Sequence, residues 1–210
     1  MSDVDFASLL CSRLCHDLVS PVGALANGIE ILADETDPDM RAQCLQLLAD
    51  SAQQTANRLK FFRLAFGAGG GFSEQVDVRE AQAAIQGMFA ADKVKLDWLV
   101  TLPALPKVAV KVLLNLSLIA GDALLRGGAL RIAAERAEDQ VELVVRAEGP
   151  RLLLGEDLRL TLTGDPASFE ATPRVAPALL VRQLLGHSGA TLRLLEPEPG
   201  VLVFGAQLAA

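Results

Sequence analysis

The chain has 210 residues, of which 51% are hydrophobic and 21% charged, and its formal net charge at pH 7 is −7. This composition is typical of a globular protein with room for one domain or two small ones, and it excludes a largely disordered chain. The negative charge, the lack of tyrosine and the single tryptophan argue against direct binding of DNA or RNA, which requires basic surfaces and often aromatic platforms.

The most apolar stretch covers residues 108–125 and is interrupted by Lys111, Asn115 and Asp122, so we expect a buried helix there and not a membrane span. The N-terminal sequence is acidic and lacks the basic region that opens a secretory signal peptide. The odd number of cysteines indicates free thiols in a reducing compartment. We therefore expect a cytoplasmic protein with neither a membrane nor a nucleic acid among its partners.

The first predicted helix spans residues 3–33. Its apolar residues recur at steps of three or four and mark one face, formed by Leu10, Leu14, Leu18, Val22, Leu25, Ile29 and Leu32. His16 lies two positions, about 200°, from both Leu14 and Leu18, which predicts that it points into solvent. Pro21 has no N–H to donate to the carbonyl of Asp17, so the helix is loosened beside that histidine. An exposed imidazole can act as a nucleophile and proton carrier at cellular pH.

Cys11, Cys15 and His16 lie close together on this helix, which raises the question of a zinc site. Three potential ligands cluster there, and Cys15 and His16 point about 100° apart on a helix. We therefore expect no metal site, and we expect these thiols to pack as small apolar side chains in a helical bundle.

The second predicted helix spans residues 38–66 and begins with Asp37 as its cap and Pro38 at its first position. Its heptad seam consists of Leu45, Leu48, Ala52, Thr55, Leu59, Phe62 and Phe66. Two antiparallel helices cannot bury their apolar faces alone, so we expect two hairpins to pair into a homodimeric four-helix bundle. The expected dimer is built on Leu45, Leu48, Leu59 and Phe62 with the apolar face of the first helix. The alternative is that the hairpin packs on the second domain of its own chain.

Residues 72–210 predict mixed elements and an α+β sandwich. Helices are expected at 79–91, 107–125 and 173–187, and strands at 94–102, 129–137, 140–147, 191–196 and 201–208. The predicted domains are therefore a helical hairpin at 1–67, a glycine-rich linker at 68–71 and the α+β domain at 72–210.

Two parts of the sequence resemble sensor histidine kinases. The stretch His16-Asp17-Leu18-Val19-Ser20-Pro21 is similar to their H-box, which is a His, an acid, Leu, any residue, Ser or Thr, and Pro. Residues 179–190 resemble the final helix of their ATP-binding domain, and residues 113–116 resemble the start of its N-box. The resemblance implies a bundle joined to an ATPase-like domain.

The ATPase-like domain departs from the kinase pattern where ATP would bind. One turn after Asn115, where the N-box has its metal-binding Asn, lies Ile119; in an alternative alignment Asp122 replaces that Asn. Residues 147–151 stand in place of the adenine-binding box, with one glycine and no aspartate in register. Residues 173–178 stand in place of the glycine-rich lid, and their two prolines lack the amide hydrogens that bind phosphate. We therefore expect a scaffold that does not bind ATP.

The whole pattern resembles the ChpT-type histidine phosphotransferases of alphaproteobacterial phosphorelays, to which residues 63–68 are also similar. This resemblance implies a dimer that takes phosphoryl groups from the receiver domain of a hybrid kinase and passes them to receivers of cell-cycle response regulators. It implies that His16 is the nucleophile and that Asp17 orients its ring and stabilises positive charge on it. It implies no cofactor or metal of the chain's own, because the receiver supplies the Mg²⁺.

Both receivers would dock on the rim around His16. The residues expected there are Val19, Ser20, Pro21 and Val22, with Lys60 and Arg63 as weaker candidates for which an ordinary solvated helix face is the alternative. Two other functions stay open at this point. One is an atypical histidine kinase that uses ATP, and the other is a non-catalytic dimeric scaffold in which His16 is incidental.

Overall fold

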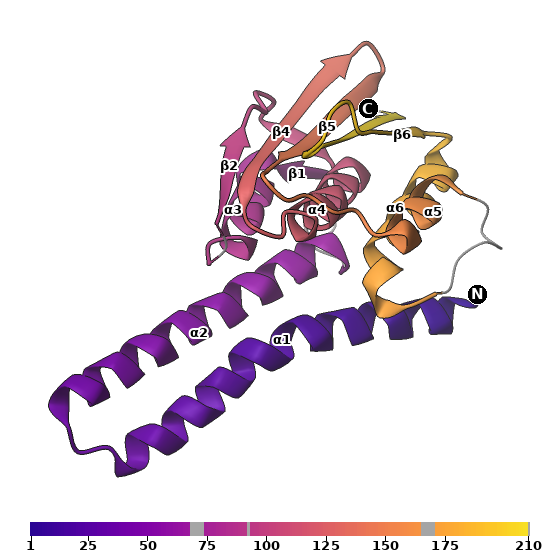
Figure 1. The fold of residues 1–210 in the computed structure, drawn as a ribbon. Helices are drawn as coiled ribbons and strands as arrows, with labels where there is room; N and C mark the ends of the chain where they lie inside the picture. Colours follow the sequence, from indigo (N-terminus) through magenta and orange to yellow (C-terminus); the bar gives the residue numbers. More distant parts are fainter. Residues whose placement is uncertain (68–73, 92, 165–170, 210) are drawn as a thin grey trace.

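A long helical hairpin and a mixed sheet with helices on one face make up the structure, a computed structural model that describes residues 1–67, 74–91, 93–164 and 171–209 (Figure 1). The helices are α1 (Asp3–Asp34), α2 (Pro38–Ala65), α3 (Val78–Met88), α4 (Lys107–Asp122), α5 (Glu156–Thr163), the short 3-10 helix η2 (Pro173–Val175) and α6 (Ala176–Ser188). The strands are β1 (Gln75–Asp77), β2 (Val94–Trp98), β3 (Ala104–Pro106), β4 (Gly128–Ala137), β5 (Gln140–Glu148), β6 (Thr191–Leu195) and β7 (Val201–Ala209). The predicted linker at 68–71 lies outside the described residues.

Caps at both helix starts fix the hairpin, as the sequence predicts for α2. The Asp37 side chain accepts hydrogen bonds from the backbone N–H groups of Asp39 (2.9 Å) and Met40 (3.0 Å). At the start of α1, Ser2 and Asp5 form a reciprocal capping box. Farther out, Gly28 lets the two helices approach closely, because a Cβ there would lie 2.8 Å from a methyl group of Leu48 on α2.

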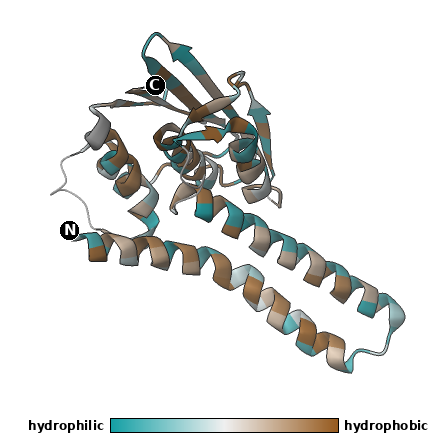
Figure 2. Cartoon of the chain, turned by 180° about the vertical axis from the view of Figure 1, so that it is seen from behind, coloured by the Kyte–Doolittle hydropathy of each residue, from teal (hydrophilic) through white to brown (hydrophobic). Residues whose placement is uncertain are grey.

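The predicted apolar face of α1 is covered less completely than we expected. Its leucines are half-buried, whereas Val22 and Ile29 are exposed, and the buried residues of α1 are Asp17, Pro21 and Gly28. Figure 2 shows apolar residues recurring along α1 and less often along α2. In the outer part of the hairpin, one partner helix is too narrow to cover a whole apolar face.

The inner end of the hairpin packs on the rest of the same chain. Phe61, Phe62, Leu64 and Ala65 of α2 belong to the main hydrophobic core, which α1 also contacts through Leu14. Phe62 is 1% exposed and stacks on Phe66, with ring centroids 5.0 Å apart. The prediction that Phe62 contributes to a dimer seam is therefore wrong, because the chain's own core buries that side chain.

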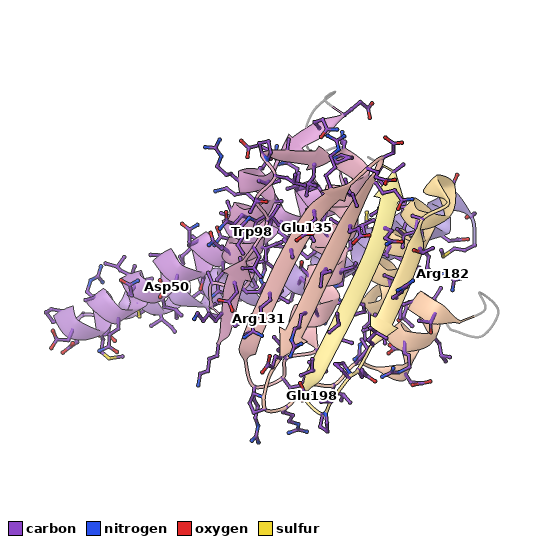
Figure 3. The ribbon with its side chains drawn as sticks, turned by 90° about the horizontal axis from the view of Figure 1, so that it is seen from above. Asp50, Trp98, Arg131, Glu135, Arg182 and Glu198 are labelled. Atoms are coloured by element: carbon purple, nitrogen blue, oxygen red, sulfur yellow. The ribbon has the colours of Figure 1, made fainter. Side chains whose placement is uncertain are left out.

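The main sheet has the strand order β2-β4-β5-β7-β6, with β2 and β4 parallel and the other neighbours antiparallel. In β4, Leu130, Ile132 and Ala134 are buried, whereas Arg131 and Glu135 are exposed, an alternation that marks one covered and one open face. Helices α4 and α6 lie on the covered face, and Figure 3 shows the open face with Arg131 and Glu135 on it. The predicted α+β class is confirmed.

The predicted β4–β5 hairpin is confirmed, and its turn contains Glu138 in the left-handed region at φ 53°. Helix α5 and the short antiparallel pair β1–β3 were not predicted from the sequence. The last helix also begins later than expected, because residues 173–175 form η2 before α6 starts at Ala176. Among the helices that the structure describes, none is long and apolar enough to cross a membrane.

Candidate functional site

His16 lies near the middle of α1, and its side chain is 84% exposed, as its position off the apolar face predicts. Its Nδ1 lies 3.0 Å from Oδ1 of the next residue, Asp17, whose side chain is 8% exposed. A carboxylate at that distance favours the tautomer that carries its proton on Nδ1. The other ring nitrogen, Nε2, is then unprotonated and available as a nucleophile.

The Asp17 carboxylate is fixed by a second partner on its other oxygen. Arg13, one turn earlier on α1, donates from Nε to Asp17 Oδ2 at 2.9 Å. The same guanidinium donates from Nη2 to Asp122 Oδ2 at 2.6 Å, at the end of α4. The pKa of Arg13 is raised, because burial, which alone would lower it, is outweighed by the charges of Asp122 and Asp17 and the hydrogen bonds to both.

Pro21 lies on the buried side of α1, one turn after Asp17. Because proline has no N–H, the carbonyl of Asp17 lacks its usual helical donor. Arg58 of α2 supplies that donor instead, from Nη1 at 2.6 Å. The loosened turn that the sequence predicts is therefore held by a hydrogen bond from the other helix of the hairpin. Arg58 fixes the main chain of Asp17, and Arg13 fixes its side chain.

The residues expected to contact a receiver fall into two groups. Val19, Ser20 and Val22 are exposed, and Val19 shows 68% of its surface, so all three can meet a partner. Pro21 was expected to contact a receiver, but it is buried and does not belong to that exposed surface. It lies on the side of α1 that faces inward.

Lys60 and Arg63 lie beside α3. Together with Asn57, Glu80 and Gly87 they line a pocket of about 330 Å³ between α2 and α3. Arg63 forms an exposed ion pair with Glu80 at 3.5 Å. Both residues therefore lie next to α3. In the part of the chain that is described, neither of them contacts His16.

Side chains fill one part of the region that resembles an ATP site, the part around Asn115 and Ile119. Asn115, at the expected start of an N-box, is fully buried and donates to the carbonyls of Ala65 at 3.3 Å and Lys111 at 2.8 Å. Ile119 and Asp122 line a cavity of about 30 Å³, closed by Arg13, Leu153, Leu158 and Arg174. Small-molecule sites typically have a volume of roughly 300–1,000 Å³. This cavity is therefore too small for a nucleotide.

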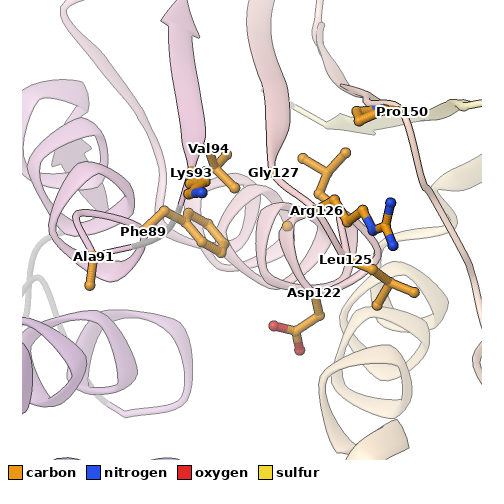
Figure 4. Close-up of a pocket in the computed structure, with 11 residues that line it drawn as sticks. Phe89, Ala91, Lys93, Val94, Asp122, Leu125, Arg126, Gly127 and Pro150 are labelled. Atoms are coloured by element: carbon orange, nitrogen blue, oxygen red, sulfur yellow. The ribbon is translucent and has the colours of Figure 1, made fainter.

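A larger, open pocket of about 850 Å³ lies on another side of the end of α4. It is lined by Phe89 and Lys93 before β2, by Asp122 and Arg126 at the end of α4 and after it, and by Pro150. Figure 4 shows the Asp122 side chain extending from the end of α4 beside this pocket. Asp122 thus borders both cavities.

The three cysteines differ in exposure. Cys44 is buried, whereas Cys11 and Cys15 are exposed, so the prediction that the latter two pack inside a bundle is not met within the single chain. Their exposure follows from the narrow contact of α1 with α2. In the described ranges, no three His, Cys, Asp or Glu side chains are grouped so that they could hold a metal ion.

The chain is similar to a protein family and to three known proteins. A family model described as the histidine phosphotransferase C-terminal domain matches residues 78–200. The protein phosphotransferase ChpT of Brucella abortus (strain 2308) is 39% identical over 153 residues, which cover 72% of this chain and 71% of that protein. The solved structure of a bacterial phosphotransferase is 30% identical, with a TM-score of 0.86, and covers 98% of this chain and 97% of that one. The histidine kinase AdeS of Acinetobacter baumannii is 15% identical, with a TM-score of 0.48, and covers 92% of this chain and 97% of that one.

The fold and the family match define the chain as a histidine phosphotransferase. The matched domain covers more than half of the chain, and the structural match extends over the hairpin as well. Within that class, the chain belongs to the ChpT-type family, as the identity to the Brucella protein shows.

Proposed function

We propose that the chain is the intermediate of a phosphorelay. His16 accepts a phosphoryl group from the receiver domain of a hybrid histidine kinase and delivers it to the receivers of response regulators, without use of ATP. The observation that carries this proposal is the pair of an exposed His16 and a buried Asp17, whose carboxylate lies 3.0 Å from the ring Nδ1. We place this relay in the cytoplasm, where free thiols such as Cys44 stay reduced.

The mechanism follows from the two ring nitrogens. The Nε2 lone pair attacks the phosphorus of the receiver's aspartyl phosphate, an N–P bond forms, and the P–O bond to the receiver's carboxylate breaks. The proton stays on Nδ1, where Asp17 accepts its hydrogen bond and stabilises the positive charge that develops on the ring. The reverse reaction transfers the group to a second receiver. The Mg²⁺ that neutralises the moving phosphoryl group belongs to the receiver.

The receiver surface that we propose surrounds His16 on α1. Val19, Ser20 and Val22 follow it within two turns and are exposed. Lys60 and Arg63 remain predicted contributors, which requires the receiver to reach the surface beside α3. Apolar side chains at the centre with cations at the rim are a common composition of protein interfaces.

We further propose that two copies pair through the outer part of the hairpin. Val22 and Ile29 of α1, and Leu45 and Leu59 of α2, are large apolar side chains that the single chain leaves between 46% and 62% exposed. Such a concentration of exposed apolar residues is typical of an interaction site. A second copy of the hairpin would bury them in a four-helix bundle.

The experiment that tests the function uses purified receiver domains phosphorylated with a radiolabel. Label that moves from a receiver to this chain, and from this chain to a second receiver, supports the relay. A chain that is never labelled would favour the scaffold alternative instead. A chain labelled directly by radiolabelled ATP, with no receiver present, would favour the kinase alternative.

A further inference from the structure

Arg13 joins two carboxylates that lie 105 residues apart in the sequence, Asp17 on α1 and Asp122 at the end of α4 (122 − 17). Its side chain is 11% exposed, so little of the guanidinium is open to water. The guanidinium donates to both carboxylates, from Nε to Asp17 Oδ2 at 2.9 Å and from Nη2 to Asp122 Oδ2 at 2.6 Å. Both carboxylates together therefore fix the orientation of the Arg13 guanidinium.

The two oxygens of the Asp17 carboxylate have different partners, and this orients the carboxylate toward the imidazole of His16. Oδ2 is engaged by Arg13, so Oδ1 is the oxygen directed at His16 Nδ1, at 3.0 Å. If the guanidinium turned away, the Asp17 side chain could rotate about its terminal bond, which is a soft torsion. The tautomer of the ring would then lose the partner that selects it.

Asp122, at the end of α4, accepts a hydrogen bond from the Arg13 guanidinium. It lies where an alignment to kinases would put a metal-binding residue, yet here it borders a cavity of about 30 Å³ that Arg13 helps to close. The charge of Asp122 also favours the ionised arginine. A residue of a degenerate nucleotide region thus touches the α1 side chain that fixes Asp17.

We propose that Arg13 and Asp122 are positioning residues for phosphotransfer, through which the second domain fixes the Asp17 carboxylate and so keeps the His16 ring in its reactive tautomer. This inference rests on the proposed function of His16. It assigns to the second domain a direct part in preparing the nucleophile. Neither residue touches the phosphoryl group; both act through Asp17.

The first test observes the ring itself. The chain contains two histidines, so in a His187→Gln background a protein labelled with ¹⁵N-histidine gives the imidazole signals of His16 alone. At a pH where the ring is neutral, the parent protein should show its proton on Nδ1. Asp122→Ala should shift the population toward the Nε2 tautomer, and Asp122→Asn, which retains an acceptor for Arg13, should shift it less.

The second test measures reactivity without a receiver. Phosphoramidate is a small donor whose N–P bond breaks, releasing ammonia, as the bond from phosphorus to His16 Nε2 forms. The rate of His16 phosphorylation should fall by about tenfold in Asp122→Ala, because a misplaced ring reacts more slowly. Arg13→Gln should lower it at least as much. Glu196→Ala removes the carboxylate, just after β6, that Arg159 of α5 contacts at 2.8 Å, and it serves as the matched control with an unchanged rate.

The outcomes separate this inference from the proposed function. If receivers transfer nothing to the chain but Asp122→Ala still shifts the tautomer and slows phosphoramidate, the positioning role stands and the relay fails. If the tautomer and the phosphoramidate rate of Asp122→Ala both equal those of the parent, the positioning role is overturned, whatever the receivers do. A slower rate with an unchanged tautomer also overturns it, since the effect would then not act through the ring.

Discussion

Arg58→Met should destabilise the chain, because it removes the donor to a main-chain carbonyl that Pro21 leaves without its helical partner. The Arg58 guanidinium donates to the Asp17 carbonyl at 2.6 Å across the hairpin. A hydrogen bond that involves a charged group contributes about 1.5–3 kcal/mol, and a carbonyl left unsatisfied costs a similar amount. We therefore expect the free energy of unfolding to fall by roughly 2 kcal/mol, since methionine retains most of the apolar stem.

A double-mutant cycle isolates this contact from other effects of the substitution. Pro21→Ala restores an N–H four residues after Asp17, so the carbonyl regains a donor within α1. In the Pro21→Ala background, Arg58→Met should then cost at least about 1 kcal/mol less than in the parent. Urea denaturation of all four proteins, at one protein concentration, gives the coupling free energy. Effects that add to within about 0.5 kcal/mol would refute the reasoning.

Three further predictions concern ATP, the dimer and the second histidine. Calorimetric titration with Mg-ATP should show no binding in the micromolar range, because the chain lacks the second Asn of the N-box, the Asp of the adenine-binding box and the glycines of the lid; tight binding would revive the kinase alternative. Leu59→Glu should convert a dimer to monomers in light scattering, because a carboxylate buried without a partner costs several kcal/mol. Gln43→Glu adds the same charge at an exposed position about 160° around α2 and should leave the dimer intact, whereas a monomeric parent would contradict the bundle. His187→Gln should transfer phosphoryl groups at the parent rate, because His187 lies in α6, in the other part of the fold.

The elements that the sequence predicts best are those with local signals. Asp37 and Pro38 mark the turn of the hairpin, and alternating residues around Glu138 mark β4 and β5, so both hairpins are confirmed. Helix α5 was missed because it has eight residues, too few for a clear helical period. Strands β1 and β3 have three residues each and pair with each other, so no alternation could reveal them.

The candidate site shows the same limit. The exposure of His16 follows from helix geometry, whereas its contact with Asp17 was expected from the resemblance to the H-box; the structure shows both. The Arg13–Asp122 contact joins residues 109 apart, and no local pattern predicts it. The sequence offers one signal for Arg13, its spacing of four residues from Asp17 on a helix, which is the spacing of an ion pair.

The burial of α1 and α2 is the feature that the helical pattern alone could not resolve. A heptad seam predicts an apolar partner but does not say which one. The structure divides that seam: Phe62 packs in the chain's own core, while Leu45 and Leu59 stay exposed. The surroundings of Lys60 and Arg63 could not be predicted from the sequence either, because they depend on how α3 packs against α2.

The most direct test of the account is to locate the phosphoryl group on the chain after incubation with a phosphorylated receiver domain. Mass spectrometry under alkaline conditions, which preserve phosphohistidine, should find the modification on His16. His16→Ala should accept no label while its circular dichroism and unfolding midpoint equal those of the parent, because the side chain is 84% exposed and contributes little to packing. Modification at another residue, or label retained by a folded His16→Ala, would contradict the assignment of His16 as the nucleophile.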